Sequence, residues 1–486
     1  MSTAVPSGSR GRPRDDQGVR FDPGSFRDPT NRIVRASGRI LRLLDERATA
    51  AWAALRESQL FGTACQDGRL VPTRQLGAEE TPEQVRADLA HGPWLTVLEH
   101  ESIPFISYPF EWSFGMLRDA ALLQLELLDA ALEEGLTVKD ASPYNIQWRG
   151  VRPQFIDIGS FAPWTQGEPW IGYRQFCQLF LFPLLLRAYK DVAFQPWLRG
   201  SVEGISPADF SALMSWRDRL RPGVLVHGWL QARLLRRFAA SERDVGRELR
   251  QSGFDRRLIQ NNVRRMTALL RGLEWRQSRS EWAAYTETCS YDPEGTDAKE
   301  RFVSEILAVG QRRQVWDLGC NTGSYSEIAA EHADLVLAID GDELSVEHLY
   351  RRLNDRGESR ILPLVIDLRQ ATPGLGWRGK ERAALEDRGR PDLVLCLALI
   401  HHLSITASIP MAEVLDWLHG LGGELVIEFP HRDDPMVERL LRPKVEPHAE
   451  YRRQVFEELL EQRFELRSRQ TLPSGTRTLY HAAPRA

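Results

Sequence analysis

The C-terminal half of the chain alternates between short apolar runs and longer amphipathic segments. Strand-like runs that alternate with helical ones form βαβ units, and such units build a parallel sheet. The sequence therefore predicts an α/β fold over residues 285–486. The five strand-like runs cover residues 314–319, 335–341, 361–368, 392–399 and 422–430.

The turn after the first run carries the sequence DLGCNTG, from Asp317 to Gly323. Glycines such as Gly319 allow a sharp turn and a close approach to a ligand. The helix that follows begins with unpaired N–H groups, which favour polar or anionic partners. Asp317 can accept a hydrogen bond from an ammonium group. Together with Cys320 and Asn321, these residues are predicted to bind a cofactor.

Acidic residues also follow the second and third runs. Asp340 is suited to bind both hydroxyls of a ribose, and Asp367 can accept from the exocyclic amine of an adenine. Because the carboxyl ends of parallel strands form the ligand site of open α/β sheets, we expect these acids to share one site. Their neighbours Gly341 and Leu368, and Leu397 after the fourth run, complete the predicted cofactor contacts.

This ordered set of strand-end residues resembles that of class I S-adenosylmethionine (SAM)-dependent methyltransferases. The DLGCNTG sequence of this chain matches the first motif of that family. Asp340 and Asp367 fall where that family has its ribose-binding and adenine-contacting acids. The resemblance covers roughly residues 285–485 and implies a Rossmann-like sheet, SAM as cofactor and methyl transfer. A dinucleotide site needs G-x-G-x-x-G, whereas the spacing here is G-x-x-x-G. A generic α/β turn without a ligand remains an alternative, against which three acids at successive strand ends argue.

No residue is singled out as a catalytic base. His401 and His402 follow the fourth run, and Glu428 and His431 flank the end of the fifth, so each could face an acceptor. A base helps when the nucleophile is a hydroxyl or a protonated amine. The alternative is that the histidine pair packs or starts a helix, and that Glu428 pairs with a local arginine.

Aromatic and basic residues near the third run and before the first could also contact substrate. Trp377, Arg378 and Arg382 belong to a long charged insert that either lines a pocket or forms a solvated loop. Tyr285 and Tyr291 lie where an aromatic segment often folds over SAM in this family.

The first half contains a second motif. Asp140 is followed by Asn145 five positions later and by Asp157-Ile-Gly twelve residues after that. Protein kinases use an Asp and Asn with this spacing and the Asp of D-F-G for catalysis and magnesium binding. Residues 30–240 therefore resemble a kinase-like α+β fold. However, the chain has no convincing Gly-rich loop and no lysine before Lys139. We expect a degenerate kinase-like domain and no metal; an active one would use Asn145 and Asp157. The alternative is a turn whose Asp and Asn cap local backbone.

Local patterns predict a hairpin over residues 31–44, a helix over 45–60, strands within 93–110, and a helix over 113–135. Two further strands flank the turn at Arg149-Gly150, and an apolar helix follows at 170–190. The predicted division is a disordered tail over 1–30, a kinase-like domain over 31–205, a mainly helical extension over 206–284 and the methyltransferase domain over 285–486. The arginines of 229–279 form either a solvated helical face with acidic partners or a site for an anion.

Composition limits the possible partners. The formal net charge of −4 argues against a dedicated nucleic-acid binder. The N-terminus lacks a signal peptide and no apolar run is long enough for a membrane span, so we expect a cytoplasmic protein without a membrane partner.

The whole arrangement is similar to bacterial two-part methyltransferases, including a rhizobial nodulation protein family, which implies a small-molecule acceptor. A bifunctional kinase–methyltransferase and a SAM-binding regulatory protein without turnover are the alternatives. Oligomeric state and acceptor are left open.

Overall fold

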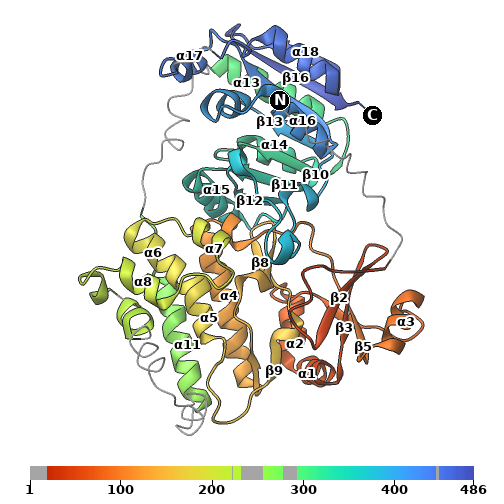
Figure 1. The fold of residues 1–486 in the computed structure, drawn as a ribbon, viewed down its shortest axis with the longest axis vertical. Helices are drawn as coiled ribbons and strands as arrows, with labels where there is room; N and C mark the ends of the chain where they lie inside the picture. Colours follow the sequence, from red (N-terminus) through yellow and green to blue (C-terminus); the bar gives the residue numbers. More distant parts are fainter. Residues whose placement is uncertain (1–18, 222, 231–254, 277–292, 445–447, 486) are drawn as a thin grey trace, which may run out of the picture. The chain divides into compact units, whose positions relative to one another are not determined.

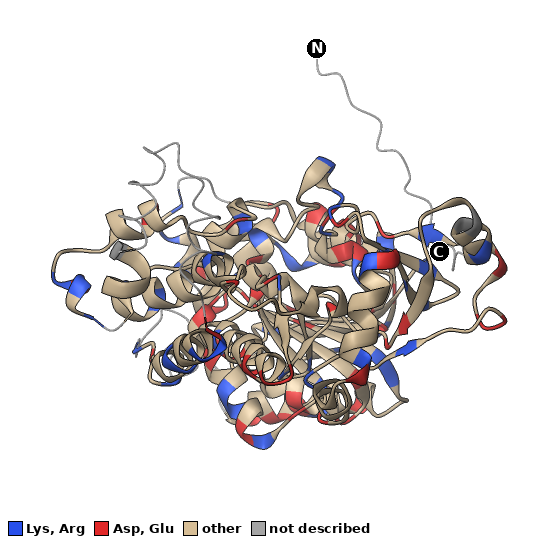
Figure 2. Cartoon of the chain, turned by 90° about the horizontal axis from the view of Figure 1, so that it is seen from below, with Lys and Arg blue, Asp and Glu red and all other residues tan. Residues whose placement is uncertain are grey.

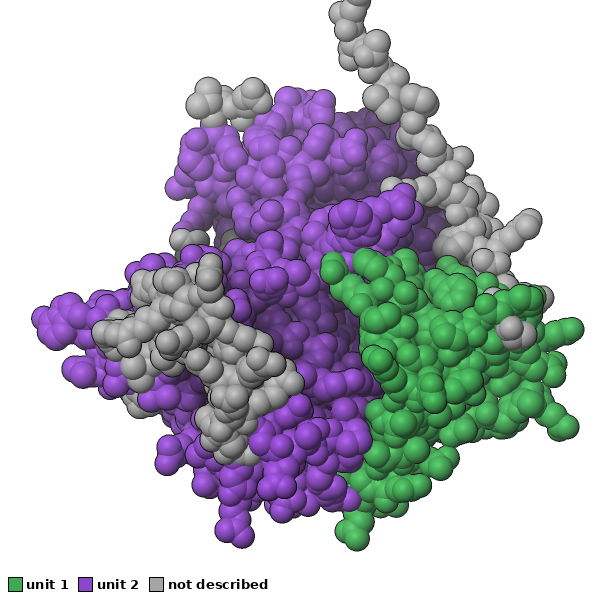
Figure 3. Space-filling model, turned by 60° about the horizontal axis from the view of Figure 1, so that its bottom comes forward, with its two compact units in different colours: residues 1–102 green, residues 103–486 purple. Residues whose placement is uncertain are grey.

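A computed structural model describes residues 19–221, 223–230, 255–276, 293–444 and 448–485. The chain forms two compact units, Met1–Ser102 and Ile103–Ala486, which Figure 3 colours separately. The described residues between 103 and 276 group with the C-terminal domain in the second unit, and the predicted boundaries at 205 and 284 stay predictions. The kinase-like domain stays a prediction.

The first unit contains a five-stranded sheet in the order β1-β2-β3-β5-β4. The predicted hairpin is confirmed: β2 and β3 pair antiparallel through a turn at Ser37 and Gly38, both with positive φ. Such a turn matches the twist of the two strands. The strands are β1 (Arg20–Phe21), β2 (Asn31–Ala36), β3 (Arg39–Leu44), β4 (Thr73–Gln75) and β5 (Thr96–His100), and the helices are α1 (Glu46–Glu57), α2 (Gln59–Gln66) and α3 (Glu83–His91).

Two predictions for the N-terminal region need correction. Most of the tail predicted over 1–30 lies outside the described residues, but Arg20–Phe21 form a strand paired with β2, so the predicted tail extends too far. Residues 103–110 form no strand. Pro109 begins the 3-10 turn Pro109–Glu111, in which the Glu111 carboxylate accepts from the Tyr108 N–H. Proline has no N–H to donate to a ladder, which disfavours a strand here.

The second unit begins with a largely helical region. The predicted helix over 113–135 is confirmed as α4, and the two strands around Arg149-Gly150 are confirmed as β7 and β8. Within the predicted extension over 206–284, residues 222, 231–254 and 277–284 lie outside the described part. The elements are α4 (Phe114–Glu133), β6 (Leu136–Val138), β7 (Ile146–Arg149), β8 (Arg152–Phe155), β9 (Phe161–Pro163), α5 (Tyr173–Phe176), α6 (Phe182–Lys190), α7 (Gln195–Gly200), α8 (Pro207–Leu213), the π-helix Val224–Leu230 and α11 (Arg256–Arg271).

The C-terminal part of this unit contains a seven-stranded sheet in the order β12-β11-β10-β13-β14-β16-β15 (Figure 1). The first five strands in this order are parallel, which confirms the predicted α/β sheet. β16 pairs antiparallel with both β14 and β15, an addition that was not predicted. The strands are β10 (Arg312–Leu318), β11 (Ala333–Asp340), β12 (Ile361–Val365), β13 (Leu393–Cys396), β14 (Glu424–Pro430), β15 (Phe464–Thr471) and β16 (Arg477–Pro484).

The helices of this part connect the strands. They are α13 (Pro293–Leu307), α14 (Ser324–Ala330), α15 (Glu343–Arg356), α16 (Met411–Leu421), α17 (Pro435–Leu441) and α18 (Arg453–Arg463), with the π-helix His402–Thr406 after β13. Among the described residues, no helix combines the length and apolarity that a membrane span requires.

Candidate cofactor site

A cavity of about 440 Å³ lies at the carboxyl ends of β10, β11, β12 and β13. This is the edge at which open parallel sheets bind ligands. Nine of the ten predicted cofactor residues line it. They are Asp317, Gly319, Cys320, Asn321, Asp340, Gly341, Asp367, Leu368 and Leu397.

The tenth residue, Gly323, does not line the cavity. It caps α14 with a φ of 84°, and a Cβ there would lie 2.6 Å from Cδ1 of Leu349. Gly319 also has a positive φ, and its N–H donates to the Ile339 carbonyl at 2.8 Å. The two glycines therefore set the path of the turn, and Gly323 does so by allowing α14 to pack against Leu349.

Asp317 ends β10 in a buried position. Its carboxylate accepts from Ser326 Oγ at 2.6 Å, and its exposed fraction is 2%. Burial raises the pKa of this carboxyl to about 6, although the Ser326 hydrogen bond and the Lys299 charge oppose the rise. A cation that reaches the cavity would favour the ionised form.

Asp340 is held by backbone groups on two sides. One carboxylate oxygen accepts from the Asn321 N–H and the other from the Asp342 N–H, each at 2.8 Å. Burial raises its pKa, and these hydrogen bonds oppose the rise. Because each carboxylate oxygen can accept more than one hydrogen bond, the fixed carboxylate can still bind a diol.

Asp367 is partly exposed and pairs with Arg369, whose Nη2 lies 2.8 Å from its carboxylate. Burial raises the pKa of this carboxyl, but the hydrogen bonds from Arg369 outweigh burial and lower it. Asp367 therefore stays ionised under conditions in which Asp317 takes up a proton.

Of the four residues expected to be able to face an acceptor, only His402 lines the cavity; His431 instead contacts Thr478 Oγ1 at 2.9 Å. His402 lines the cavity from the start of the π-helix, and burial lowers its pKa to about 4. His401 is fully buried behind it, with ring centroids 4.0 Å apart, and has no hydrogen-bond partner among the described residues. This placement fits the packing alternative for His401.

Glu428 is also fully buried, within a chain of ion pairs. Its carboxylate lies 3.1 Å from Nη1 of Arg477 and 2.6 Å from Nζ of Lys299. Arg477 in turn contacts Asp434 at 2.6 Å. Because burial without pairing would be costly, this arrangement fits the local-arginine alternative for Glu428.

Lys299 was missed by the sequence reasoning. It lies on α13, lines the cavity with an exposed fraction of 4%, and has its ammonium 4.8 Å from the centre of the Tyr325 ring. A signal was present: this lysine occupies the face of α13 that otherwise carries Ala298, Phe302 and Val303. A charge on an apolar helix face needs a buried partner, which is a reason to expect a site.

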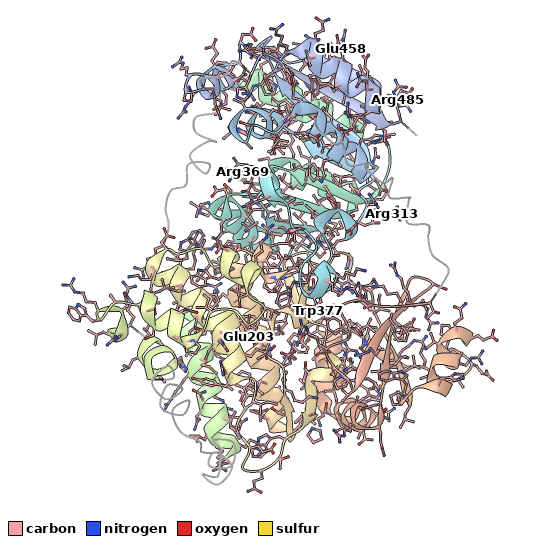
Figure 4. The ribbon with its side chains drawn as sticks, viewed as in Figure 1. Glu203, Arg313, Arg369, Trp377, Glu458 and Arg485 are labelled. Carbon is pink, nitrogen blue, oxygen red and sulfur yellow. The ribbon has the colours of Figure 1, made fainter. Side chains whose placement is uncertain are left out.

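The other predicted substrate residues do not line the described cavity. Trp377 is 67% exposed, and Arg382 stacks over the Tyr144 ring at 5.1 Å. Figure 4 labels Trp377 of the insert and the cavity residue Arg369, which belongs to the turn Leu368–Gln370 before the insert. Tyr285 and Tyr291 lie outside the described residues.

The kinase-like motif does bring its residues together. Asn145 Nδ2 donates to Ser160 Oγ at 3.3 Å, and Ser160 Oγ donates to Asp157 at 2.5 Å. Burial, reinforced by the Asp157 charge, raises the pKa of Asp140. Within the described residues, no group of three or more His, Cys, Asp or Glu side chains is arranged to hold a metal ion.

The arginines of α11 have acidic partners. Arg264 pairs with Asp129 at 3.3 Å, and Arg271 pairs with Glu126 at 3.3 Å. Figure 2 shows that basic and acidic residues are interspersed over the ribbon. For these two arginines, the solvated-face interpretation is confirmed.

The fold and the cavity define a Rossmann-like α/β domain joined to a helical region within one compact unit. No family model matches the chain. It is 34% identical over 464 residues to nodulation protein NoeA from Rhizobium meliloti (strain 1021), and the alignment covers 94% of each chain. The chain belongs to the NoeA family.

Solved structures resemble part of the chain more distantly. N-methyltransferase NodS from Bradyrhizobium japonicum WM9 is 16% identical, with a TM-score of 0.30, over 40% of this chain and 99% of NodS. The SAM-bound magnesium protoporphyrin IX methyltransferase from Synechocystis PCC 6803 is also 16% identical, with a TM-score of 0.29, over 43% of this chain and 88% of that enzyme.

Proposed function

We propose that the chain is a SAM-dependent methyltransferase that acts on a small molecule. The observation that carries the proposal is the placement of Asp317, Asp340 and Asp367 around one cavity, each at the end of a different parallel strand. Their spacing along the sheet suits the ammonium, ribose and adenine of one SAM molecule. Asn321 adds a buried amide oxygen without a partner among the described residues, which a ligand in this cavity would satisfy.

Each residue has a separate task in this proposal. Asp317 pairs with the methionine ammonium, Asp340 accepts from the ribose hydroxyls, and Asp367 accepts from the adenine amine. Lys299 supplies a cation beside Asp317, which suits the methionine carboxylate. When bound, SAM supplies an activated methyl group, so the protein chiefly aligns a nucleophile with it and excludes water.

The acceptor side is lined by His402, Leu403 and Thr406 of the π-helix. π-helical turns often occur at functional sites. Because burial keeps the pKa of His402 near 4, its imidazole is neutral at pH 7 and can accept a hydrogen bond from an acceptor. We therefore assign His402 an orienting role, and His401 and Glu428 a structural one. The net charge of −4 and membership of a nodulation protein family favour a small-molecule acceptor over nucleic acid.

Two measurements on the full chain test the proposal. Isothermal titration should detect binding of S-adenosylhomocysteine (SAH), and Asp340→Ala should weaken it by about a hundredfold, since two hydrogen bonds to a charged group are lost. Asp334→Ala is the matched control, because Asp334 is exposed near the opposite end of the same strand. Mass spectrometry of extracts incubated with the enzyme and methyl-labelled SAM should then reveal the product. Failure of the wild type to bind SAH would refute the proposal, and binding without any labelled product would favour the regulatory alternative.

The cluster of Asp140, Asn145 and Asp157 supports a bifunctional kinase–methyltransferase as a second candidate. The hydrogen bonds through Ser160 hold Asn145 and Asp157 together. We expect an active kinase to consume ATP in a magnesium-dependent manner that Asp157→Ala abolishes. A wild-type chain that binds no nucleotide would exclude this candidate.

A further inference from the structure

The start of α15 belongs to the wall of the cofactor cavity. Its N-cap residue, Asp342, lines the cavity, and the Asp342 N–H donates to Asp340 at 2.8 Å. The position of this helix therefore sets the position of the proposed ribose-binding carboxylate. A contact that holds the start of α15 from outside the cavity therefore also acts on the nucleoside end of the site.

The middle of α15 is held by α4 and the residue before it. The Glu347 carboxylate accepts from Ser113 Oγ and from the Gly115 N–H, each at 2.7 Å. Tyr350 donates to Asp119 at 2.6 Å. Glu347 and Tyr350 are both about 1% exposed, so these contacts lie inside the compact unit.

The first residue of α15, Glu343, makes the contact nearest the cavity. Its carboxylate lies 2.7 Å from Nη2 of Arg187 on α6, and both side chains are about 10% exposed or less. Arg187 is fixed in turn by Asp191, at 3.0 Å, and by the Trp275 ring, over which its guanidinium lies at 4.0 Å. Trp275 also donates to Asp191 at 2.8 Å. A preorganised arginine thus reaches the start of α15 from the helical region.

A second contact reaches the proposed adenine side. Arg199 at the end of α7 donates to the carbonyl of Gln370 at 3.2 Å. Gln370 ends the short turn that follows Asp367. The helical region therefore contacts the elements behind both nucleoside-binding acids.

We propose that Arg187 is a positioning residue for the nucleoside end of the cofactor, acting through Glu343 and the start of α15. The proposal rests on the proposed function, because the ligand is SAM. The helical region then contributes to cofactor affinity without touching the cofactor. Small displacements of positioning groups are enough to weaken a site substantially.

The test compares SAH with 5′-methylthioadenosine, which keeps the nucleoside but lacks the amino-acid part. We expect Arg187→Met in the full chain to raise the Kd of both ligands by a similar factor, on the order of tenfold. Arg187→Lys, which keeps the charge, should recover part of the affinity. The matched control is Asp119→Asn, which removes the carboxylate charge from the acceptor of the Tyr350 hydroxyl and so weakens that contact two turns further along the same helix. It should lower the thermal midpoint but change either Kd by less than about twofold.

Other results would overturn the inference. If Arg187→Met does not fold, Glu343→Gln removes the charge while keeping the shape, and it should weaken both ligands in the same way. Unchanged affinity in a folded variant, or equal weakening by Asp119→Asn, would show that Arg187 serves stability alone. Weaker binding of SAH with unchanged binding of 5′-methylthioadenosine would place the effect of Arg187 at the amino-acid end of the ligand and contradict the proposal. A wild type that binds neither ligand would instead refute the proposed function itself.

Discussion

Binding of SAH should depend on pH through Asp317. An ordinary aspartate has a pKa of about 3.9, and burial raises that of Asp317 to about 6. This difference corresponds to about 3 kcal/mol in favour of the neutral carboxyl. If the ligand ammonium binds only the ionised carboxylate, binding must release the proton. The affinity then rises as pH increases through about 6.

The magnitude follows from the ionised fraction. Asp317 is about one-tenth ionised at pH 5 and about nine-tenths ionised at pH 7, so the Kd should be about tenfold larger at pH 5. Isothermal titration in buffers with different ionisation enthalpies should detect release of about half a proton at pH 6. Asp317→Asn should bind more weakly at pH 7 and lose this pH dependence.

Two control variants separate Asp317 from the other acids of the cavity. Asp367→Asn should weaken binding but keep the pH dependence, because the pKa of Asp367 is lowered and it stays ionised. Asp340→Asn should also keep the pH dependence. This variant is needed as a control because burial raises the pKa of Asp340 as well as that of Asp317. A wild-type Kd that is the same at pH 5 and pH 7, or a pH dependence that survives Asp317→Asn, would refute the reasoning.

Three further predictions concern stability and can be checked by urea unfolding of the full chain. Glu111→Gln should cost about 3 to 5 kcal/mol, because it leaves the buried Arg388 guanidinium without the compensating carboxylate charge 2.6 Å away; a loss below about 1 kcal/mol would contradict this. Gly323→Ala should cost about 2 to 4 kcal/mol, since it combines a φ of 84° with a contact at 2.6 Å to Leu349. Arg264→Ala should cost less than about 1 kcal/mol, because its ion pairs are exposed.

The sequence predicted the sheet and the cavity well because both depend on local patterns. Each apolar run is long enough to define a strand, and each acid directly follows one, so the register of a parallel sheet brings Asp317, Asp340 and Asp367 to one edge. The role of Gly323 was harder to assign, because the steric limit set by Leu349 depends on the packing of two helices.

What the sequence did not predict depends on contacts between distant residues. Glu111 and Arg388 are 277 positions apart, and each alone resembles an ordinary surface charge. Arg187 and Glu343 are likewise far apart in the sequence, and each alone resembles an ordinary surface charge. The strand predicted over 103–110 from its apolar composition does not form, because Pro109 has no N–H to donate and begins a 3-10 turn instead. Ion pairs between residues distant in the sequence join the helical region to the α/β domain, and no local sequence pattern predicts such pairs.

The strand order at the end of the sheet has a consequence for synthesis on the ribosome. β15 is made before β16, yet within the seven-stranded sheet it pairs only with β16, which separates it from β14. β15 therefore has no hydrogen-bonding neighbour in the sheet until residues Arg477–Pro484 have been translated. β16 also carries Arg477, which balances the buried charges of Glu428 and Asp434. The buried cluster of Lys299, Glu428 and Asp434 thus gains its second cation only when β16 has been made, so a nascent chain stalled before residue 477 should remain a substrate for chaperones.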